Sequence, residues 1–223
     1  LNATCNEFND TFENYKQKLL KKHAIHVPQD VRTIEKAMEL VATLQMDPTE
    51  KDPLRIVLDK GIHEIVGYTD QHGILRKSVY VTCSHITFVG KGKDHTTILG
   101  GFFVDNQQNV TFEELTITNQ YWNGLTLSGC GLFLIDSTVD MLKCAVKKGG
   151  WTGMWVGDGA TVTATQCEFM ENDSNGVFCG GANTKARLND CQMHHNGQDG
   201  LYAHGHAVVD LHGTKTDIHS NKG

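Results

Sequence analysis

A repeat of about 23 residues constrains the fold of this chain more than any other feature of its sequence. Seven short segments share one pattern: a small or polar residue, then an apolar residue, any residue, and another apolar residue. They are RIVL at Arg55, SVYV at Ser78, GFFV at Gly101, GLTL at Gly124, GMWV at Gly153, GVFC at Gly176 and GLYA at Gly200. All intervals are 23 or 24 residues except that from Gly124 to Gly153, which is 29. A flat sheet would not return to the same phase so regularly, so the period indicates a solenoid with one repeat per coil.

The alternation within each segment predicts a β-strand whose two apolar residues point into a shared core. These inward residues are Ile56, Val79, Phe102, Leu125, Met154, Val177 and Leu201 at the first position, and Leu58, Val81, Val104, Leu127, Val156, Cys179 and Ala203 at the second. Two further apolar pairs follow in several coils, such as Ile86 with Phe88 and Leu115 with Ile117. We therefore predict an all-β solenoid with three short strands per coil.

Asparagines recur shortly after the predicted third strand. They are Asn119, Asn172, Asn196 and Asn221. An asparagine tolerates left-handed backbone and can bond neighbouring backbone groups, so stacked asparagines suit the corners of a solenoid. Cys167, Cys191 and Thr216 also fall at matching positions and predict a small inward ladder.

The N-terminal part has a different pattern. Residues 1–26 can form an amphipathic helical segment, and residues 27–54 contain a capping helix, VRTIEKAMELVATL, with apolar residues at helical spacing. Asp30 or Thr33 can cap this helix, which would hide the apolar core and open strand edges at the end of the solenoid over 55–223. No such cap follows the last coil, so we expect the C-terminal end to be truncated and either to continue or to be covered by another chain.

Composition excludes some functions. The net charge is -6, which gives no basic footprint for nucleic acid. No apolar run approaches the roughly 18 residues that a membrane span needs. The seven cysteines are odd in number and form no CxxC pair, which favours free thiols in a reducing compartment. With no visible signal peptide, these features favour an intracellular location.

Several segments together carry a family resemblance. VPQDVRTIEKAMEL, RIVLDKGIHEI and ITFVGKGKDHTTILGG resemble the start of the right-handed parallel β-helix in the pectin lyase-like superfamily. The later coils are similar to the repeats of carbohydrate-binding proteins and sugar hydrolases, which also occur in some F-box proteins. Over residues 27–223 the resemblance implies a right-handed parallel β-helix with an N-terminal α-helical cap. It implies no single activity, because the superfamily includes lyases, hydrolases, esterases, epimerases and non-enzymatic modules.

The segment HNGQDGLY is similar to part of the polygalacturonase pattern. By position Asp199 matches the first acid, and Asp173 lies at a nearby corner one coil earlier. Inverting glycosidases need two carboxyl groups roughly 6.5–9.5 Å apart, a range that neighbouring coils can supply. However, Ser174 and Asn175 stand where the family has an Asp-Asp pair.

A lyase or epimerase would need a cation to neutralise a uronate and a base to remove a proton. Arg187 could supply the cation, and Tyr202 or His204 the base. His204 and His206 are also weak candidates for a metal site, because they share a face of an extended segment. Surface histidines at corners are the simpler interpretation, and no cofactor is expected.

The outward position between the two inward ones holds large aromatic residues in most coils. It reads Tyr80, Phe103, Thr126, Trp155, Phe178 and Tyr202. Stacked at roughly 5 Å per coil, these side chains would form a platform for sugars or for a protein partner. The one long interval predicts a protruding loop with Lys147, Lys148 and Trp151, which could extend this platform or bury it.

Three functions fit these patterns. The first, which we favour, is a non-catalytic recognition module that binds a polysaccharide or a protein partner along the aromatic stripe. The second is a polysaccharide lyase, epimerase or hydrolase with an atypical site for uronate-type glycans. The third is a structural spacer. Convergent carboxylates with an arginine would favour the second, and a stripe buried by the loop would favour the third.

Overall fold

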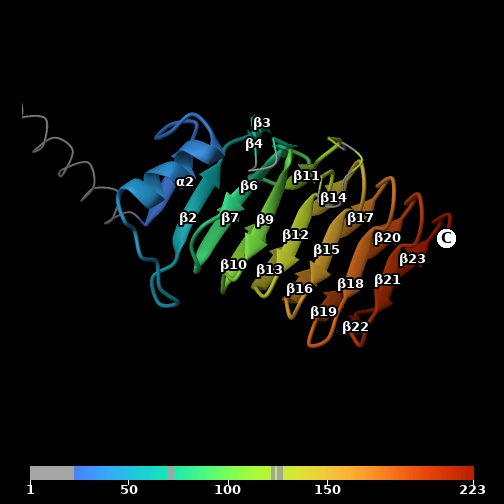
Figure 1. Cartoon of the computed structure of the whole chain (residues 1–223). Helices are drawn as coiled ribbons and strands as arrows, with labels where there is room; N and C mark the ends of the chain where they lie inside the picture. The colour runs from blue at the N-terminus through green and yellow to red at the C-terminus, as the bar shows by residue number, and fades with distance from the viewer. Residues whose placement is uncertain (1–22, 70–72, 122–123, 125–127) are drawn as a thin grey trace, which may run out of the picture.

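The chain winds into a parallel β-solenoid, with helix α2 (Ile34–Thr43) at its N-terminal end (Figure 1). The computed structural model describes residues 23–69, 73–121, 124 and 128–223. Three sheets run along the solenoid, and each coil from β6 onward adds one strand to each of them. Neighbouring strands in these sheets are parallel, because each strand pairs with its equivalent in the next coil.

The six-stranded sheet carries the repeated segments from which the period was recognised. Its strands in spatial order are β6 (Ser78–Val81), β9 (Gly101–Asp105), β12 (Leu132–Ile135), β15 (Met154–Gly157), β18 (Val177–Gly180) and β21 (Leu201–His204).

The eight-stranded sheet follows the six-stranded sheet within each coil. Its strands are β1 (Ala24–Val27), β2 (Leu54–Leu58), β7 (Ile86–Val89), β10 (Val110–Glu113), β13 (Thr138–Leu142), β16 (Thr161–Thr165), β19 (Lys185–Asn189) and β22 (Val208–His212).

The seven-stranded sheet completes the coil. It contains β3 (Gly61–Glu64), β8 (Thr96–Leu99), β11 (Thr116–Thr118), β14 (Ala145–Lys147), β17 (Glu168–Met170), β20 (Gln192–His194) and β23 (Asp217–His219). A small antiparallel hairpin of β4 (Tyr68–Thr69) and β5 (Leu75–Arg76) stands apart from the three sheets.

Two of the seven predicted segments were assigned to the wrong strand. RIVL belongs to β2 in the eight-stranded sheet, where Ile56 pairs with Phe88, and not beside β6. The strand between β9 and β15 is GLFL at Gly131 and not GLTL at Gly124, and residues 125–127 of the latter lie outside the described residues. RIVL and GLTL fit the same alternating pattern as the strands of the six-stranded sheet, so the sequence alone did not show which segments belong to this sheet.

The core lies between the sheets and is filled mainly by the predicted inward residues. Among those predicted, Ala203 is exposed and Leu201 only partly buried, and Leu125 and Leu127 lie outside the described residues. Phe102 of the six-stranded sheet packs with Phe88 and Phe112 of the eight-stranded sheet, at ring-centroid distances of 5.0 and 4.8 Å. At the N-terminal end, Ile34, Ala37, Met38 and Val41 of α2 join this core. The burial of these side chains supplies the main stabilisation of the solenoid.

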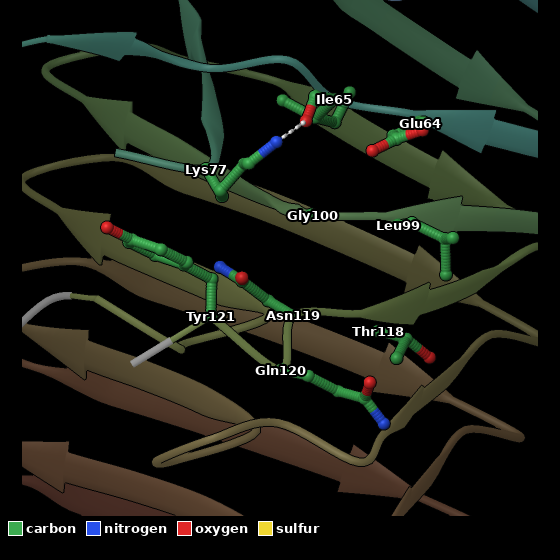
Figure 2. A pocket seen from close by; sticks show the side chains of 9 residues that line it. All are labelled: Glu64, Ile65, Lys77, Leu99, Gly100, Thr118, Asn119, Gln120 and Tyr121. Atoms are coloured by element: carbon green, nitrogen blue, oxygen red, sulfur yellow. Dashed lines mark hydrogen bonds between the residues drawn. The ribbon is translucent and has the colours of Figure 1, made fainter. Parts of the chain in front are cut away.

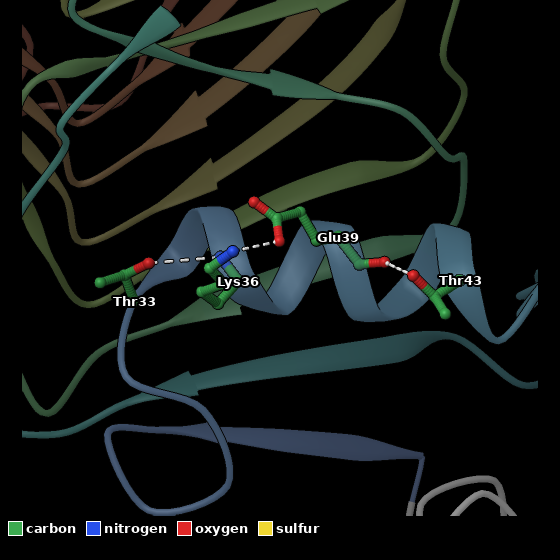
Figure 3. Close-up of polar contacts among 4 residues, drawn as sticks. All are labelled: Thr33, Lys36, Glu39 and Thr43. Atoms are coloured by element: carbon green, nitrogen blue, oxygen red, sulfur yellow. Dashed lines mark hydrogen bonds and ion pairs between the residues drawn. The ribbon is translucent and has the colours of Figure 1, made fainter.

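The N-terminus of α2 is capped by Thr33 and not by Asp30. The Thr33 side chain accepts a hydrogen bond from the backbone nitrogen of Lys36 at 3.2 Å (Figure 3). Of the helical segment predicted over residues 1–26, residues 1–22 lie outside the described residues, and Ala24–Val27 form strand β1 instead. At the other end Leu211 and Ile218 are exposed, and a cover for this end stays a prediction.

The predicted asparagine ladder runs through three coils. Asn172 Nδ2 donates to Asn196 Oδ1 at 3.0 Å, and Asn196 Nδ2 donates to Asn221 Oδ1 at 2.9 Å. Asn119 does not join this ladder. In the coil before Asn172, Gly149 takes the position of a ladder asparagine, and its backbone nitrogen donates to Asn172 Oδ1 at 2.9 Å. The Asn119 side chain instead bonds the carbonyl of Cys130 at 2.8 Å.

The six cysteines that the structure describes are free thiols, as predicted, and Cys5 lies outside this part of the chain. Cys167 and Cys191 occupy the expected inward positions, and Cys144 extends their row by one coil. Burial raises the pKa of Cys179 to about 12, so this thiol stays protonated at neutral pH.

We predict that Asn196→Ala lowers the free energy of unfolding by about 2–3 kcal/mol, because it leaves the buried backbone N–H of Asn172 without an acceptor. The matched control is Asn189→Ala on the outer surface, where the amide makes one hydrogen bond to Thr165 at 3.3 Å. Urea unfolding measures both variants. Equal losses would show that the ladder does not stabilise the corners.

Candidate functional site

Six aromatic side chains occupy the same outward position on successive strands of the six-stranded sheet. These residues, which we call the aromatic ladder, are Tyr80, Phe103, Phe133, Trp155, Phe178 and Tyr202. Successive ring centroids lie 5.0, 5.4, 4.3, 5.5 and 5.6 Å apart. The predicted row of aromatics is therefore present, with Phe133 in the place expected for Thr126.

The four rings from Phe133 to Tyr202 stack on one another along the solenoid, whereas Phe103 is tilted by 56° from Tyr80 and by 34° from Phe133. The planes of Phe133 and Trp155 differ by 5°, and those of Trp155 and Phe178 by 10°. Phe133, Trp155 and Phe178 therefore turn their faces toward one another and their edges toward solvent. Phe133 is only 4% exposed, whereas Tyr80 and Tyr202 at the two ends are 39% and 44% exposed. The ladder thus differs from a platform of rings that lie flat, because most ring faces are already covered.

Two glycines make room for the rings to lean along their strands. A Cβ added at Gly157 would overlap Cη2 of Trp155, and one added at Gly180 would lie 2.9 Å from Cε1 of Phe178. Each glycine follows its aromatic residue by two positions and so shares the outward face of the strand. The spacing in MWVG and VFCG was a signal for this arrangement that the sequence reasoning did not use.

Carboxylates line one side of the ladder, where the strands end. The Tyr80 hydroxyl donates to Asp105 Oδ2 at 3.3 Å. Asp136 and Asp158 are exposed and follow β12 and β15 at left-handed positions, with φ of 43° and 48°. Partial burial, followed by the negative charge of Asp105, raises the pKa of Tyr80, so its phenol stays neutral. These acceptors were not predicted, because their alignment requires the correct strand register.

The predicted catalytic residues lie on two of the sheets and in the turns between strands. Tyr202 and His204 lie together on β21 with ring centroids 5.8 Å apart. Asp173 and Asp199 lie in the turns that lead into β18 and β21. Arg187 lies on β19 of the eight-stranded sheet, where its Nη2 is 3.8 Å from Asp210 Oδ2. The structure therefore places the arginine on a different sheet from Tyr202 and His204.

The predicted protruding loop with Lys147, Lys148 and Trp151 is wrong. Six residues separate β14 from β15, the same number as between β17 and β18. Lys147 ends β14 in the seven-stranded sheet, and Lys148 Nζ lies 3.8 Å from Glu171 Oε2. The extra residues lie instead in the connection between β11 and β12, which is thirteen residues long. Part of this connection, 122–123 and 125–127, lies outside the described residues.

A small cavity of about 160 Å³ lies beside the start of this insertion (Figure 2). Glu64, Lys77 and Tyr121 line it, and Lys77 Nζ donates to the carbonyl of Ile65 at 3.3 Å. Asn119 also lines the cavity, although only 2% of this residue is exposed. The sequence did not predict this cavity.

No metal centre is evident in the described part of the chain: no group of three or more His, Cys, Asp or Glu side chains there could hold an ion. His204 packs its ring edge-on against Phe178 at 5.2 Å, and the exposed His206 lies in the turn that follows. A separate histidine cluster forms at the C-terminal end, where His194 and His195 approach within 2.7 Å through their Nδ1 atoms. Partial burial and the nearby histidines lower the pKa of His194.

The family description "right handed beta helix region" matches residues 68–223. The chain belongs to the right-handed β-helix family. The predicted right-handed parallel β-helix fold is thereby confirmed. No curated protein matches the sequence of this β-helix at a significant level. Within the described ranges, no helix is long and apolar enough to cross a membrane.

Solved structures show the same fold at low sequence identity. ORF18 of Geobacillus virus E2 has a TM-score of 0.62 at 14% identity, over 92% of this chain and 42% of the viral chain. A pectin methylesterase mutant in complex with a hexasaccharide has a TM-score of 0.54 at 11% identity, over 85% of this chain and 66% of the esterase chain. The catalytic domain of Agl-KA has a TM-score of 0.51 at 18% identity, over 85% of this chain and 36% of that domain's chain. The matches thus span less than two thirds of each of these proteins.

We predict that Gly157→Ala destabilises the β-helix by about 1–3 kcal/mol, because the new methyl group would displace the Trp155 ring from the strand. The same substitution in a Trp155→Ala background is the control, since the overlapping ring is then absent. Chemical unfolding of the four proteins measures the difference. An equal penalty in both backgrounds would contradict the placement of the ring.

Proposed function

We propose that this β-helix is a recognition module for a polysaccharide that lies along the aromatic ladder, parallel to the solenoid axis. The observation that carries this proposal is an aromatic row over six strands with carboxylates along one side. A polymer of similar units can repeat the same contact from one coil to the next. The rings are held by their neighbours, so little side-chain entropy is lost when a ligand binds.

The chemistry of the ladder favours a sugar polymer over a protein partner. Aromatic edges carry partial positive charge and suit the ring and hydroxyl oxygens of a sugar. The carboxylates of Asp136 and Asp158 accept hydrogen bonds from hydroxyl donors, and such charge-assisted bonds are strong. The exposed faces of Tyr80 and Tyr202 add apolar contacts at the two ends.

The same carboxylates disfavour a uronate polymer. Asp105, Asp136 and Asp158 would bring negative charge next to the carboxylates of such a glycan, and like charges in contact reduce affinity. The net charge of -6 adds to this repulsion. We therefore infer a neutral glycan as the ligand, which narrows the recognition hypothesis and weighs against the uronate-acting enzyme. The hexasaccharide bound by the structurally similar pectin methylesterase supports a role for this fold in sugar binding in general.

Trp155→Ala tests this proposal. Removing a central ring should weaken binding of a neutral glycan by roughly tenfold, because the contact row is interrupted. Affinity electrophoresis against neutral polysaccharides and polygalacturonate measures the change. The matched control is Leu142→Ala, which removes an exposed side chain from the eight-stranded sheet and should leave binding unchanged. Thermal unfolding of both variants separates lost binding from lost stability.

The proposal is overturned if no glycan binds the wild-type protein, or if Trp155→Ala binds as well as wild type. Stronger binding of polygalacturonate than of neutral glycans would contradict the inferred charge selectivity. Release of new reducing ends or unsaturated products from any of these polymers would favour the enzymatic alternative.

A further inference from the structure

A second cavity lies at the N-terminal end of the solenoid, where α2 meets the first strand of the six-stranded sheet. Its volume is about 330 Å³, which falls in the range of small-molecule sites. Glu35 and Glu39 of α2 line one side, and Tyr68 and Tyr80 line another. No lysine, arginine or histidine is among the lining residues in the described part of the chain. The cavity is therefore both acidic and aromatic.

The Glu35 carboxylate is held by two backbone amides, and no cationic side chain among the described residues pairs with it. Its Oε1 accepts a hydrogen bond from the backbone nitrogen of Val66 at 2.7 Å and a longer one from that of Gly67 at 3.4 Å. Its Oε2 is buried without a hydrogen-bond partner among the described residues. None of the ion pairs within the described ranges includes Glu35. A buried carboxylate oxygen without a partner is costly, so a bound cation would stabilise this arrangement.

Glu39 lies one turn further along the same helix and adds a second negative charge. It pairs with Lys36 on the exposed surface of α2 (Figure 3). The side chains of both Lys36 and Glu39 are more than half exposed in this pair. An ion pair this exposed contributes little free energy, so Lys36 can leave it easily when a ligand binds.

On the aromatic side of the cavity, the Tyr80 ring is oriented by the hydrogen bond from its hydroxyl to Asp105. Tyr68 is 41% exposed, and it follows the two backbone amides that Glu35 holds. Met38 and Val79 are buried and form apolar parts of the lining. An electron-rich ring attracts a cation most strongly where water is partly excluded.

We propose that this cavity binds a small organic cation of the alkylammonium class. The carboxylate of Glu35 supplies the counter-charge, the two tyrosine rings contact the charged head, and Met38 and Val79 contact alkyl groups. A small hydrated metal ion fits less well, because half of this lining is apolar or aromatic. This site goes beyond the glycan-binding proposal and does not depend on it, although Tyr80 belongs to both surfaces.

Choline is the probe, and its uncharged isostere with carbon in place of nitrogen is the control ligand. Two-dimensional NMR titration of the wild-type protein should show saturable binding of choline, with shifts in the segment that carries Tyr68, and at least roughly tenfold weaker binding of the isostere. Glu35→Gln should reduce choline affinity by roughly tenfold or more. Its amide oxygen can still accept from Val66 and Gly67, so the fold should be retained.

Two further variants complete the test. Tyr68→Leu keeps an apolar side chain but removes a ring, and we expect about fivefold weaker choline binding. Glu171→Gln makes the same change in net charge at the distant pair with Lys148 and should bind choline as wild type does. Glycan binding should be unchanged in Glu35→Gln, which separates this site from the ladder. Equal affinity for choline and its isostere, no choline binding by the wild type, or unchanged binding by Glu35→Gln would each overturn the proposal.

Discussion

Parallel hydrogen bonding between equivalent strands of successive coils is the constraint on which the rest of the structure depends. Phe103, Phe133, Trp155 and Phe178 are direct partners across β9, β12, β15 and β18, with no shift of register. A one-residue slip would turn every inward side chain of a strand outward. The same alignment brings Asn172, Asn196 and Asn221 within hydrogen-bonding distance of one another. The core side chains, the corner asparagines and the outward aromatic residues therefore all recur at equivalent positions from one coil to the next.

Stacking along the axis determines what the ladder can present to a ligand. Since Phe133, Trp155 and Phe178 cover one another, a ligand meets their edges, while Phe103 is tilted and Tyr80 and Tyr202 are the most exposed rings. Gly157 and Gly180 allow this arrangement because a side chain at either position would push a ring away from the strand. The neighbouring aspartates add acceptors and negative charge, and these favour hydroxyl groups over carboxylates in a ligand. At the N-terminal end, Tyr80 links this surface to the acidic cavity under α2.

Much of the fold could be predicted because the inward positions are spaced by the coil itself. Phe102, Val104, Met154 and Val156 were recognised from period and alternation alone, and each is buried. The wrong strand assignments arose where two neighbouring segments both match the repeated pattern. GLTL at Gly124 and GLFL at Gly131 look alike, and choosing the first moved the insertion from between β11 and β12 to the region of Lys147.

The candidate site was less predictable because it depends on which sheet a residue joins. Arg187 is close to Tyr202 in sequence, but the corner between them turns the chain from one sheet to the next. Asp136 and Asp158 follow paired residues, Ile135 and Gly157, whereas Asp105 itself pairs with Ile135, so the three aspartates come near one end of the strands only after the strands are paired. The cavity between α2 and β6 depends on where the helix packs, which a helical pattern alone does not specify.

The most direct test of the stacked ladder is a double-mutant cycle on Phe133 and Trp155, with each residue changed to leucine singly and together. The two rings lie 4.3 Å apart, so unfolding free energies should reveal a coupling of about 0.5–1.5 kcal/mol. The pair Tyr80 and Tyr202, at opposite ends of the sheet, should show coupling near zero. Additive effects at Phe133 and Trp155, or equal coupling in the two pairs, would contradict the stacking of equivalent side chains from coil to coil.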